Sequence, residues 1–348
     1  MRAAVWTPEA DIEVVEEDAP TPGPGEVVLS MRSAGICGSD LHRYRKPDVD
    51  PAPTGRPGHE NGGVVAAVGP GVDGLREGDV VGVEPIVRCQ ECDRCRAGWY
   101  TQCRRAPFAL LGERHPGGMA EFMLAPAYTA YPAPPGVDAE IAALAEPVAC
   151  SVNAVDLVDV RPGETVLVLG AGNIGLTGIL ALRAAGAKVL ITARYEHQAE
   201  AARRLGADEV IPADESGAAR LQELRQQEAV DVVFESVGGA ADTMADAMRT
   251  VRPRGRVVML GVFMTPRVSI NPFDLLLHEI HLTGAVVYGS PPGRRPHFAE
   301  ALDVVAQFPG ETRSLITHRF PIDDAARAFA TAADKANKSI KVHINPSA

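Results

Sequence analysis

At residues 170–175 the chain reads Gly-Ala-Gly-Asn-Ile-Gly, and this stretch decides the fold that the sequence predicts. It follows the apolar run Thr165–Leu169, which is typical of a buried strand, and it leads into a helical pattern. In this setting the first glycine makes a tight turn, the second lets a pyrophosphate approach the backbone, and the third allows close packing of the helix. The alternative is a structural turn without a ligand. The residues predicted to contact a dinucleotide are Gly170, Gly172, Asn173, Ile174 and Gly175.

Strand-like and helical patterns alternate along this half of the chain. The strand-like runs are Thr165–Leu169, Lys188–Thr192, Glu209–Ile211, Val230–Phe234, Arg256–Leu260 and His281–Val286. The helical patterns between them include Glu196–Leu205, Ala218–Glu228 and Ala240–Thr250. Units of this size predict an α/β fold over residues 156–292, with a doubly wound parallel sheet of six strands and helices on both faces.

The first 155 residues have a different pattern. Short β-type runs such as Val27–Met31, Val64–Val68 and Asp79–Val83 are separated by clusters of Pro and Gly. Many short strands with such turns predict an antiparallel, barrel-like domain over residues 1–155. Residues 293–348 return to helix and short strand, and we expect this segment to rejoin the first domain.

The composition narrows the class of protein. The chain has 348 residues, 46% of them hydrophobic and 23% charged, as in a folded globular protein of two domains. Its formal net charge of −11 argues against a nucleic-acid-binding protein, which needs a basic face. Acidic residues near the N-terminus argue against a signal peptide, and glycines in the longest uncharged run, Thr165–Leu182, argue against a membrane span. We therefore expect a cytoplasmic enzyme or binding protein.

Arg194 bears on the choice of nicotinamide cofactor. An NAD site usually places an acidic residue at the end of the second strand, where it binds the ribose 2′-hydroxyl. Here that position is Ala193, and Arg194 follows it. An arginine pairs with a 2′-phosphate that a carboxylate would repel, so Ala193 and Arg194 predict NADP(H) in preference to NAD(H). The alternative is that Arg194 is a solvated surface charge and Glu196 binds the ribose.

Four of the six cysteines are crowded into a short segment, which indicates a metal site and not disulfides. The spacing Cys-x2-Cys-x2-Cys-x7-Cys supplies four thiolates, which close a tetrahedral zinc shell and leave no open position. We predict a structural zinc in a lobe at residues 88–104. Its ligands are Cys89, Cys92, Cys95 and Cys103. An iron–sulfur cluster is an alternative, whereas a nucleic-acid-binding zinc module would need a basic fold around the lobe.

A second set of potential metal ligands is dispersed along the first half of the chain. Its members are Cys37, Ser39, Asp40, His42, His59, Glu60 and Glu146. Cys, His and carboxylate are the ligands of a catalytic zinc that keeps a position for water or substrate. Each residue alone is weak support, because a single His or Cys is more often a core or surface residue.

The order of these motifs points to a known family. The segment Gly58-His59-Glu60-x2-Gly63-x5-Gly69-x2-Val72 is similar to the zinc signature of the medium-chain alcohol dehydrogenases. The Cys37 segment, the four-cysteine lobe and the glycine motif follow that family's order, so the chain resembles it over essentially its whole length. Glu146, where vertebrate alcohol dehydrogenases have a cysteine, makes the chain similar to the polyol branch (sorbitol and butanediol dehydrogenases). The resemblance implies a GroES-like, partly open β-barrel catalytic domain joined to a Rossmann domain.

The resemblance also implies roles for individual residues. Cys37 and His59 would hold the catalytic zinc, and Glu60 and Glu146 would bind it directly or through water. Which of these two carboxylates is seated at rest stays open. The remaining assignments are Asp40, which would orient the zinc histidine; Ser39, which would touch the substrate oxygen; His42, which would relay the proton to solvent; and Lys341, which would lie between the zinc carboxylate and the cofactor phosphates.

The implied activity is zinc-dependent hydride transfer between a secondary alcohol or polyol, or the matching ketone, and NADP(H), with two zinc ions per chain. The expected partners are the small-molecule substrate and further copies of the chain, with a homotetramer favoured over a dimer and no nucleic acid or membrane. Apolar residues in Val257–Leu260 and His281–Val287 would support subunit pairing. The alternatives are a dehydrogenase of a 3-hydroxy amino acid or an aminocyclitol, and a non-catalytic NADP(H)-binding relative.

Overall fold

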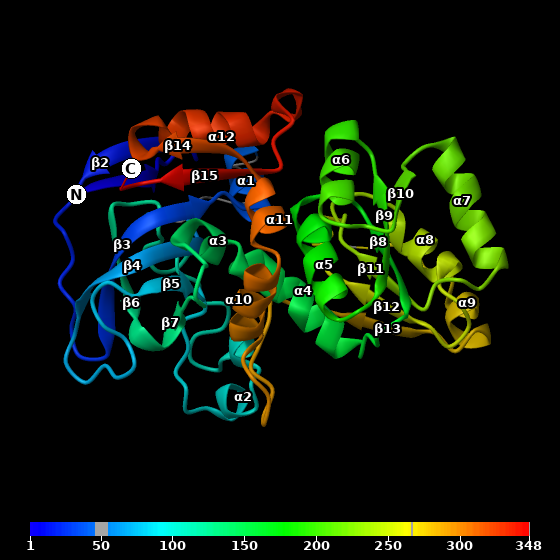
Figure 1. Ribbon diagram of the computed structural model, residues 1–348, viewed down its shortest axis with the longest axis horizontal. Helices are drawn as coiled ribbons and strands as arrows, with labels where there is room; N and C mark the ends of the chain where they lie inside the picture. The colour runs from blue at the N-terminus through cyan, green and yellow to red at the C-terminus, as the bar shows by residue number, and fades with distance from the viewer. Residues whose placement is uncertain (46–54, 266, 348) are drawn as a thin grey trace. The chain divides into compact units, whose positions relative to one another are not determined.

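The chain forms two compact units in a computed structural model that describes residues 1–45, 55–265 and 267–347. One unit is Met1–Glu146 with the segment from Gly289 onward, and the other is Pro147–Tyr288 (Figure 1). The first boundary lies earlier than the predicted 155–156. Helix α4 (Ala145–Leu157) explains the difference, because from Pro147 onward it belongs to the second unit, within which Thr177 Oγ1 donates to the carbonyl oxygen of Pro147 at 3.4 Å.

A seven-stranded sheet forms the frame of the first unit. Its order is β14-β15-β3-β4-β5-β7, and β6 also pairs with β3. The strands are β3 (Glu26–Gly35), β4 (Glu60–Val68), β5 (Val80–Val83), β6 (Phe122–Pro126), β7 (Ala130–Pro132), β14 (Ile316–Pro321) and β15 (Lys341–Asn345). A separate hairpin consists of β1 (Arg2–Trp6) and β2 (Ile12–Glu16). All pairs except β14 with β15 are antiparallel, which confirms the predicted GroES-like, barrel-type domain.

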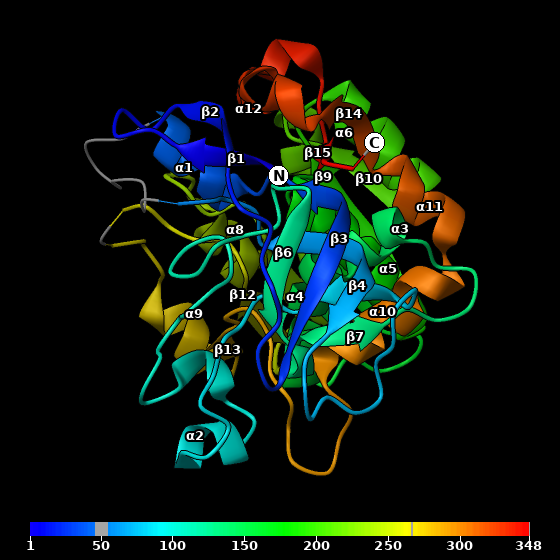
Figure 2. The ribbon, with the colours of Figure 1, turned by 90° about the vertical axis from the view of Figure 1, so that its left-hand side faces the viewer.

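Strand β3 is central to this unit, because it pairs with β15, β4 and β6. Its alternating residues Val27, Leu29 and Met31 are fully buried in a core with Val65 and Val81, as expected of a strand with one face on the core. Figure 2 shows β3 and β4 running side by side. This pairing places the end of β3 beside the start of β4.

Short helices surround the sheet of the first unit. They are α1 (Gly38–Arg45), α2 (Asp93–Arg96), α3 (Ala139–Ala143), α10 (His297–Gln307), α11 (Pro309–Ser314) and α12 (Ala325–Ala333), with 3-10 turns η1 (Tyr100–Gln102), η2 (Ala127–Thr129), η3 (Ile322–Asp324) and η4 (Lys335–Asn337). Phe329 of α12 packs edge-on against Trp6 of β1, with ring centroids 5.3 Å apart. The C-terminal segment is therefore part of the core of the first unit.

The second unit contains a six-stranded sheet in the order β10-β9-β8-β11-β12-β13, with all neighbours parallel. The strands are β8 (Thr165–Leu169), β9 (Lys188–Ala193), β10 (Glu209–Pro212), β11 (Val232–Glu235), β12 (Arg256–Met259) and β13 (His281–Gly284). Its helices, besides α4, are α5 (Asn173–Ala184), α6 (Glu196–Arg204), α7 (Glu215–Gln226), α8 (Thr243–Thr250) and α9 (Pro272–Leu277). The doubly wound sheet that the sequence predicted is confirmed, with element ends shifted by a few residues.

Two consequences follow from this sheet. The long uncharged run Thr165–Leu182 is divided between β8 and α5, and no helix among the described residues is long and apolar enough to cross a membrane. Val257 and Val258 in β12 are fully buried, and Val257 belongs to a core that includes Met244 and Met248 of α8. The prediction that these two residues support subunit pairing is therefore wrong, because the core of their own sheet already covers them.

Candidate functional site

Three of the predicted metal ligands come together in the first unit. Cys37 follows the end of β3, His59 precedes β4, and Glu60 is the first residue of β4. Each offers one ligand atom, and these atoms all lie within 4.8 Å of one another. The pairing of Gly35 with Glu60 across β3 and β4 explains this closeness, because it joins two segments that are distant in the sequence.

The charge around His59 favours a cation. Burial lowers the pKa of His59, but the nearby Cys37 thiol and the carboxylates of Asp40 and Glu146 outweigh it, so its pKa lies well above the usual value. The Nδ1 atom of His59 and the Oδ1 atom of Asp40 are buried, and neither has a hydrogen-bond partner among the described residues. A thiol, an imidazole and carboxylates in an environment that attracts positive charge fit a zinc ion.

Asp40 supports the loop that carries Cys37. It lies in the first turn of α1, it is fully buried, and its Oδ2 atom accepts the backbone N–H of Cys37 at 2.9 Å. Burial raises the pKa of Asp40, whereas the neighbouring His59 acts in the opposite direction. The structure thus shows Asp40 holding Cys37, and its role in orienting His59 stays a prediction.

Glu60 is paired with Lys341 in the interior of the first unit. The Nζ atom of Lys341 lies 2.7 Å from Oε1 and 2.5 Å from Oε2 of Glu60, and each side chain is only 1% exposed. Nζ also donates to the carbonyl oxygen of Ile36 at 3.3 Å. Burial by itself raises the pKa of Glu60, but Lys341 and His59 lower it below the usual value. Glu60 is therefore held as a carboxylate, and the ammonium of Lys341 is directed at it.

The other predicted residues of this site are distributed around the cluster. Glu146 lies in the first turn of α4 and is 6% exposed, but the group of three ligand atoms within 4.8 Å does not include it. Ser39 and His42 are three residues apart on α1, so they lie on one face of the helix. Ser39 is half-buried and His42 is exposed. Their roles toward substrate and solvent stay predictions.

The four cysteines of the lobe converge as the spacing predicted. The sulfur atoms of Cys89, Cys92, Cys95 and Cys103 all lie within 4.8 Å of one another, and none of the described cysteines forms a disulfide. The Sγ–Sγ distances are 3.9 Å for Cys89 and Cys95 and 3.5 Å for Cys92 and Cys95. A tetrahedral zinc with bonds of about 2.3 Å requires sulfur atoms about 3.8 Å apart, so this cluster fits a structural zinc.

Backbone N–H groups around the lobe favour thiolates. Hydrogen bonds from the backbone of Arg104 and Cys95 lower the pKa of Cys92 to about 6, whereas burial raises the pKa of Cys95 to about 12.

A buried polar network that the sequence analysis missed anchors this lobe. Glu84 at the end of β5 is fully buried, and its Oε2 atom lies 2.7 Å from Nη1 of Arg88. The hydroxyl of Tyr100 donates to Oε1 of Glu84, and the guanidinium of Arg88 lies 3.9 Å from the centre of the Tyr100 ring. The sequence held one indication of this network: a glutamate directly after the apolar run Val80–Val83, four residues before an arginine.

The glycine motif of the second unit has the geometry that the sequence predicted. Gly170 has φ +96°, and a Cβ on Gly175 would lie only 1.9 Å from the carbonyl oxygen of Gly170. A Cβ on Gly172 would meet no atom within 4 Å. Gly172 is the N-cap of α5, whose first turn begins with Asn173 and Ile174. The open space at Gly172 and the uncapped N–H groups of a twelve-residue helix fit a pyrophosphate.

Ala193 and Arg194 lie at the carboxyl end of β9, as expected. Ala193 is buried and Arg194 is exposed, with its guanidinium 5.6 Å from the centre of the Tyr195 ring. The carboxylate of Glu196, the alternative ribose ligand, lies 2.7 Å from Nη1 of Arg203 on the same helix.

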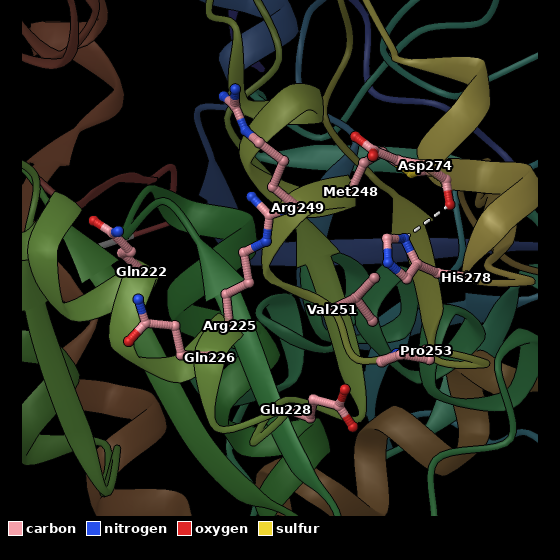
Figure 3. A pocket seen from close by; sticks show the side chains of 10 residues that line it. All are labelled: Gln222, Arg225, Gln226, Glu228, Met248, Arg249, Val251, Pro253, Asp274 and His278. Carbon is pink, nitrogen blue, oxygen red and sulfur yellow. Dashed lines mark hydrogen bonds between the residues drawn. The ribbon is translucent and has the colours of Figure 1, made fainter.

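A surface pocket of about 420 Å³ in the second unit contains none of the predicted site residues (Figure 3). Its lining comes mainly from α7, α8 and the loops that follow them, and from α9, where Nδ1 of His278 lies 3.2 Å from the carbonyl oxygen of Asp274. These loops lead into the amino ends of β11 and β12, whereas ligands of doubly wound sheets bind at the carboxyl ends of the strands. We do not include this pocket in the functional site.

Comparisons with known proteins agree with the two units. The pattern of the alcohol dehydrogenase GroES-like domain matches residues 23–135, and that of the zinc-binding dehydrogenases matches residues 173–307. An L-threonine 3-dehydrogenase of Pyrococcus furiosus is 36% identical over 81% of this chain and 80% of its own length. A sorbitol dehydrogenase of Bacillus subtilis is 28% identical over 99% of this chain and 97% of its own. A solved zinc-binding dehydrogenase from Sinorhizobium meliloti, bound to NADP, is 30% identical with a TM-score of 0.88 and covers 99% of both chains.

Proposed function

This chain belongs to the zinc-binding medium-chain dehydrogenases, and from that premise we propose that it oxidises a secondary alcohol or polyol, or reduces the matching ketone, with NADP(H). The observation that carries the proposal is the group of Cys37, His59 and Glu60, whose ligand atoms lie within 4.8 Å. A non-catalytic relative would have no need of this set. The sorbitol dehydrogenase that matches nearly the whole chain supports a polyol as substrate.

The residues present assign the parts of the reaction. Cys37 and His59 would hold the catalytic zinc, with Glu60 or Glu146 as the third protein ligand. When bound, zinc acts as a Lewis acid on the alcohol oxygen, and the nicotinamide accepts the hydride. Ser39 would accept the hydroxyl proton, and His42, one turn further along α1, would pass it to solvent. Cys89, Cys92, Cys95 and Cys103 would hold the structural zinc.

The test is an absorbance assay of nicotinamide reduction with a panel of polyols, simple secondary alcohols, L-threonine and aminocyclitols. We expect turnover of one class, and we expect Cys37→Ala and His59→Ala to abolish it without preventing cofactor binding. Cys150→Ala is the matched control, because Cys150 lies outside both metal sets. Normal turnover in the Cys37 or His59 variant would refute the zinc mechanism.

A 3-hydroxy amino acid is the second candidate substrate. It is favoured by the L-threonine 3-dehydrogenase that is 36% identical to this chain. Threonine carries its secondary hydroxyl beside an ammonium and a carboxylate, whereas a polyol carries only hydroxyls. A higher kcat/KM for L-threonine than for every polyol in the panel would decide for this candidate.

The preference for NADP(H) over NAD(H) is supported by Arg194. Its guanidinium is exposed at the end of β9, where it can pair with a 2′-phosphate. Glu196, the alternative ligand of the ribose, is already paired with Arg203. We expect Arg194→Ala to lower kcat/KM for NADP about tenfold or more and to leave that for NAD unchanged. The control is Arg204→Ala, which removes a different exposed arginine, the last residue of α6. A wild-type preference for NAD would reject the proposal.

Assembly into a homo-oligomer, with a tetramer favoured over a dimer, is supported by the open edge of the second sheet. Within the described part of the chain, strand β13 has a neighbour only on the β12 side, and Leu282 and Val286 are 37% and 43% exposed. Nearby α9 exposes Leu276 at 75% and Leu277 at 61%. An uncovered apolar edge of this kind is typical of a subunit interface. Light scattering should show an assembly that Leu282→Asp weakens, and a monomeric wild type would contradict it.

We also propose a cytoplasmic location. The use of four cysteines as one metal-type cluster suits a reducing compartment, in which thiols stay unpaired. Zinc analysis and thiol titration of protein isolated under mild conditions should give two zinc ions per chain and no disulfide.

A further inference from the structure

One row of residues crosses three neighbouring strands of the first unit. The register pairs His343 of β15 with Gly35 of β3, and Gly35 with Glu60 of β4. Side chains in one row of an antiparallel sheet lie on the same face. Gly35, in the middle of the row, has no side chain, so the side chains on either side face each other across it.

The distances at Gly35 show how close these neighbours come. A Cβ on Gly35 would lie 2.3 Å from Oε2 of Glu60 and 3.2 Å from Nε2 of His343. Both atoms are thus within 3.2 Å of one point above Gly35. Any side chain at this position would separate them, which gives a physical reason for a glycine inside this strand.

His343 is fully buried, and only one of its ring nitrogens is engaged. Nδ1 lies 2.6 Å from the hydroxyl oxygen of Ser33, which is on the same face of β3 as Gly35. Nε2 is buried and has no hydrogen-bond partner among the described residues. A buried ring nitrogen such as Nε2 is unfavourable without a hydrogen-bond partner. An acceptor that comes within hydrogen-bond distance of Nε2 when side chains move is therefore expected to pair with it.

The surroundings of His343 decide where its proton lies. The hydroxyl of Ser33, 2.6 Å from Nδ1, can donate to that nitrogen or accept from it, so the group that faces Nε2 decides which nitrogen carries the hydrogen. A lone pair on Nε2 would face the Glu60 carboxylate, whereas an N–H there is attracted to it. The charges therefore favour the tautomer with hydrogen on Nε2, in which the hydroxyl of Ser33 donates to Nδ1.

We propose that His343 is a positioning residue for the catalytic metal site: its Nε2–H, which faces Glu60 across Gly35, becomes a second donor for this carboxylate, beside Lys341, when the side chain of Glu60 moves. Glu60 then has two donors, and its ligand atom lies within 4.8 Å of those of Cys37 and His59. His343 and Lys341 together limit how far the carboxylate moves toward the metal ligands. This inference rests on the zinc-dependent function proposed above.

The experiment replaces one ring nitrogen at a time. In His343→Gln the amide nitrogen can take the place of Nε2, whereas in His343→Asn it can take only the place of Nδ1, so the first variant keeps the donor and the second removes it. Chelator competition should show that the catalytic metal is bound about tenfold more weakly in His343→Asn than in the wild type, a typical effect of losing a residue that supports a ligand. The visible spectrum of cobalt in this site should shift in His343→Asn and be restored in His343→Gln.

A measurement on the wild-type enzyme needs no variant. Nitrogen NMR of protein labelled at histidine should assign the hydrogen of His343 to Nε2. Hydrogen on Nδ1, or equal metal affinity and cobalt spectra in His343→Asn and the wild type, would overturn the role of His343 and leave the zinc function standing. A wild-type enzyme with zinc only at the four cysteines would overturn the proposed catalytic site, and this role with it.

Discussion

Replacing Lys341 by Met should destabilise the first unit strongly. The change removes the ammonium from a pair in which each side chain is 1% exposed and both carboxylate oxygens of Glu60 lie within 2.7 Å of Nζ. The Met side chain fills a similar volume, so the main loss is electrostatic. Breaking a buried ion pair by removing one partner typically lowers the free energy of unfolding by about 3–5 kcal/mol, because the remaining charge stays buried without compensation.

Urea unfolding followed by tryptophan fluorescence measures this loss directly. The two tryptophans, Trp6 and Trp99, are both in the first unit, so their signal reports on the unit that contains the pair. Free zinc must be held constant, because a metal that binds only the folded protein adds to its stability. We expect a lower urea midpoint in Lys341→Met with an unchanged slope.

The double variant Glu60→Gln/Lys341→Met is the control. It removes both charges, so its loss should be well below the sum of the two single losses, with a coupling of about 2 kcal/mol or more. The pH dependence has a defined sign. Without Lys341, burial raises the pKa of Glu60, so the deficit of Lys341→Met should shrink as the pH falls and this carboxylate takes up a proton. A loss below about 1 kcal/mol in Lys341→Met, or strictly additive losses, would refute this account of the pair.

Four further substitutions have expected outcomes. Gly172→Ala should weaken cofactor binding about tenfold, or about 1.4 kcal/mol, and leave the melting temperature unchanged, because its Cβ meets no protein atom. Gly175→Ala should instead lower the melting temperature, since its Cβ would overlap the backbone carbonyl of Gly170. A lower melting temperature in Gly172→Ala, with weaker cofactor binding but an unchanged melting temperature in Gly175→Ala, would contradict the roles given to these two glycines. Cys95→Ser should reduce the zinc content from two ions to one per chain by metal analysis, and a variant that retains both would exclude the four-thiolate site. Arg319 holds the pKa of Glu140 below its usual 4.5, so Glu140 stabilises the fold at neutral pH, and this contribution is lost as the pH falls through the lowered pKa. At pH 7 the free energy of unfolding of Glu140→Gln should therefore be up to about 1 kcal/mol lower than that of the wild type, and the difference should disappear in acid. A difference that grows in acid would disprove this account.

Features that depend on residues close together in the chain could be predicted from the sequence. The glycine motif at 170–175 is a local turn between a strand and a helix, so its spacing alone predicts which glycine turns, which packs closely and which leaves open space. The four cysteines lie in one short lobe, so short loops suffice to bring their sulfur atoms together. The parallel sheet followed from the alternation of apolar runs and helical patterns, and only the element ends differ.

Other features were decided by the pairing of distant strands. Cys37, His59 and Lys341 belong to one site because β3 pairs with both β4 and β15, and no local pattern contains that register. The apolar residues of β12 illustrate the same limit. Val257 and Val258 are as hydrophobic as an interface residue, and only the tertiary structure shows that the core of their own unit already buries them.

The sequence by itself thus determined the chemistry available to this protein: a dinucleotide turn, a four-thiolate cluster, and a thiol, imidazole and carboxylates for a second metal. Only the tertiary structure decided which of these groups meet. It placed Lys341 on Glu60, and it placed His343 across Gly35 from the same carboxylate. The physical reason is that side-chain contacts across a sheet are set by strand register, which depends on hydrogen bonds between segments some three hundred residues apart.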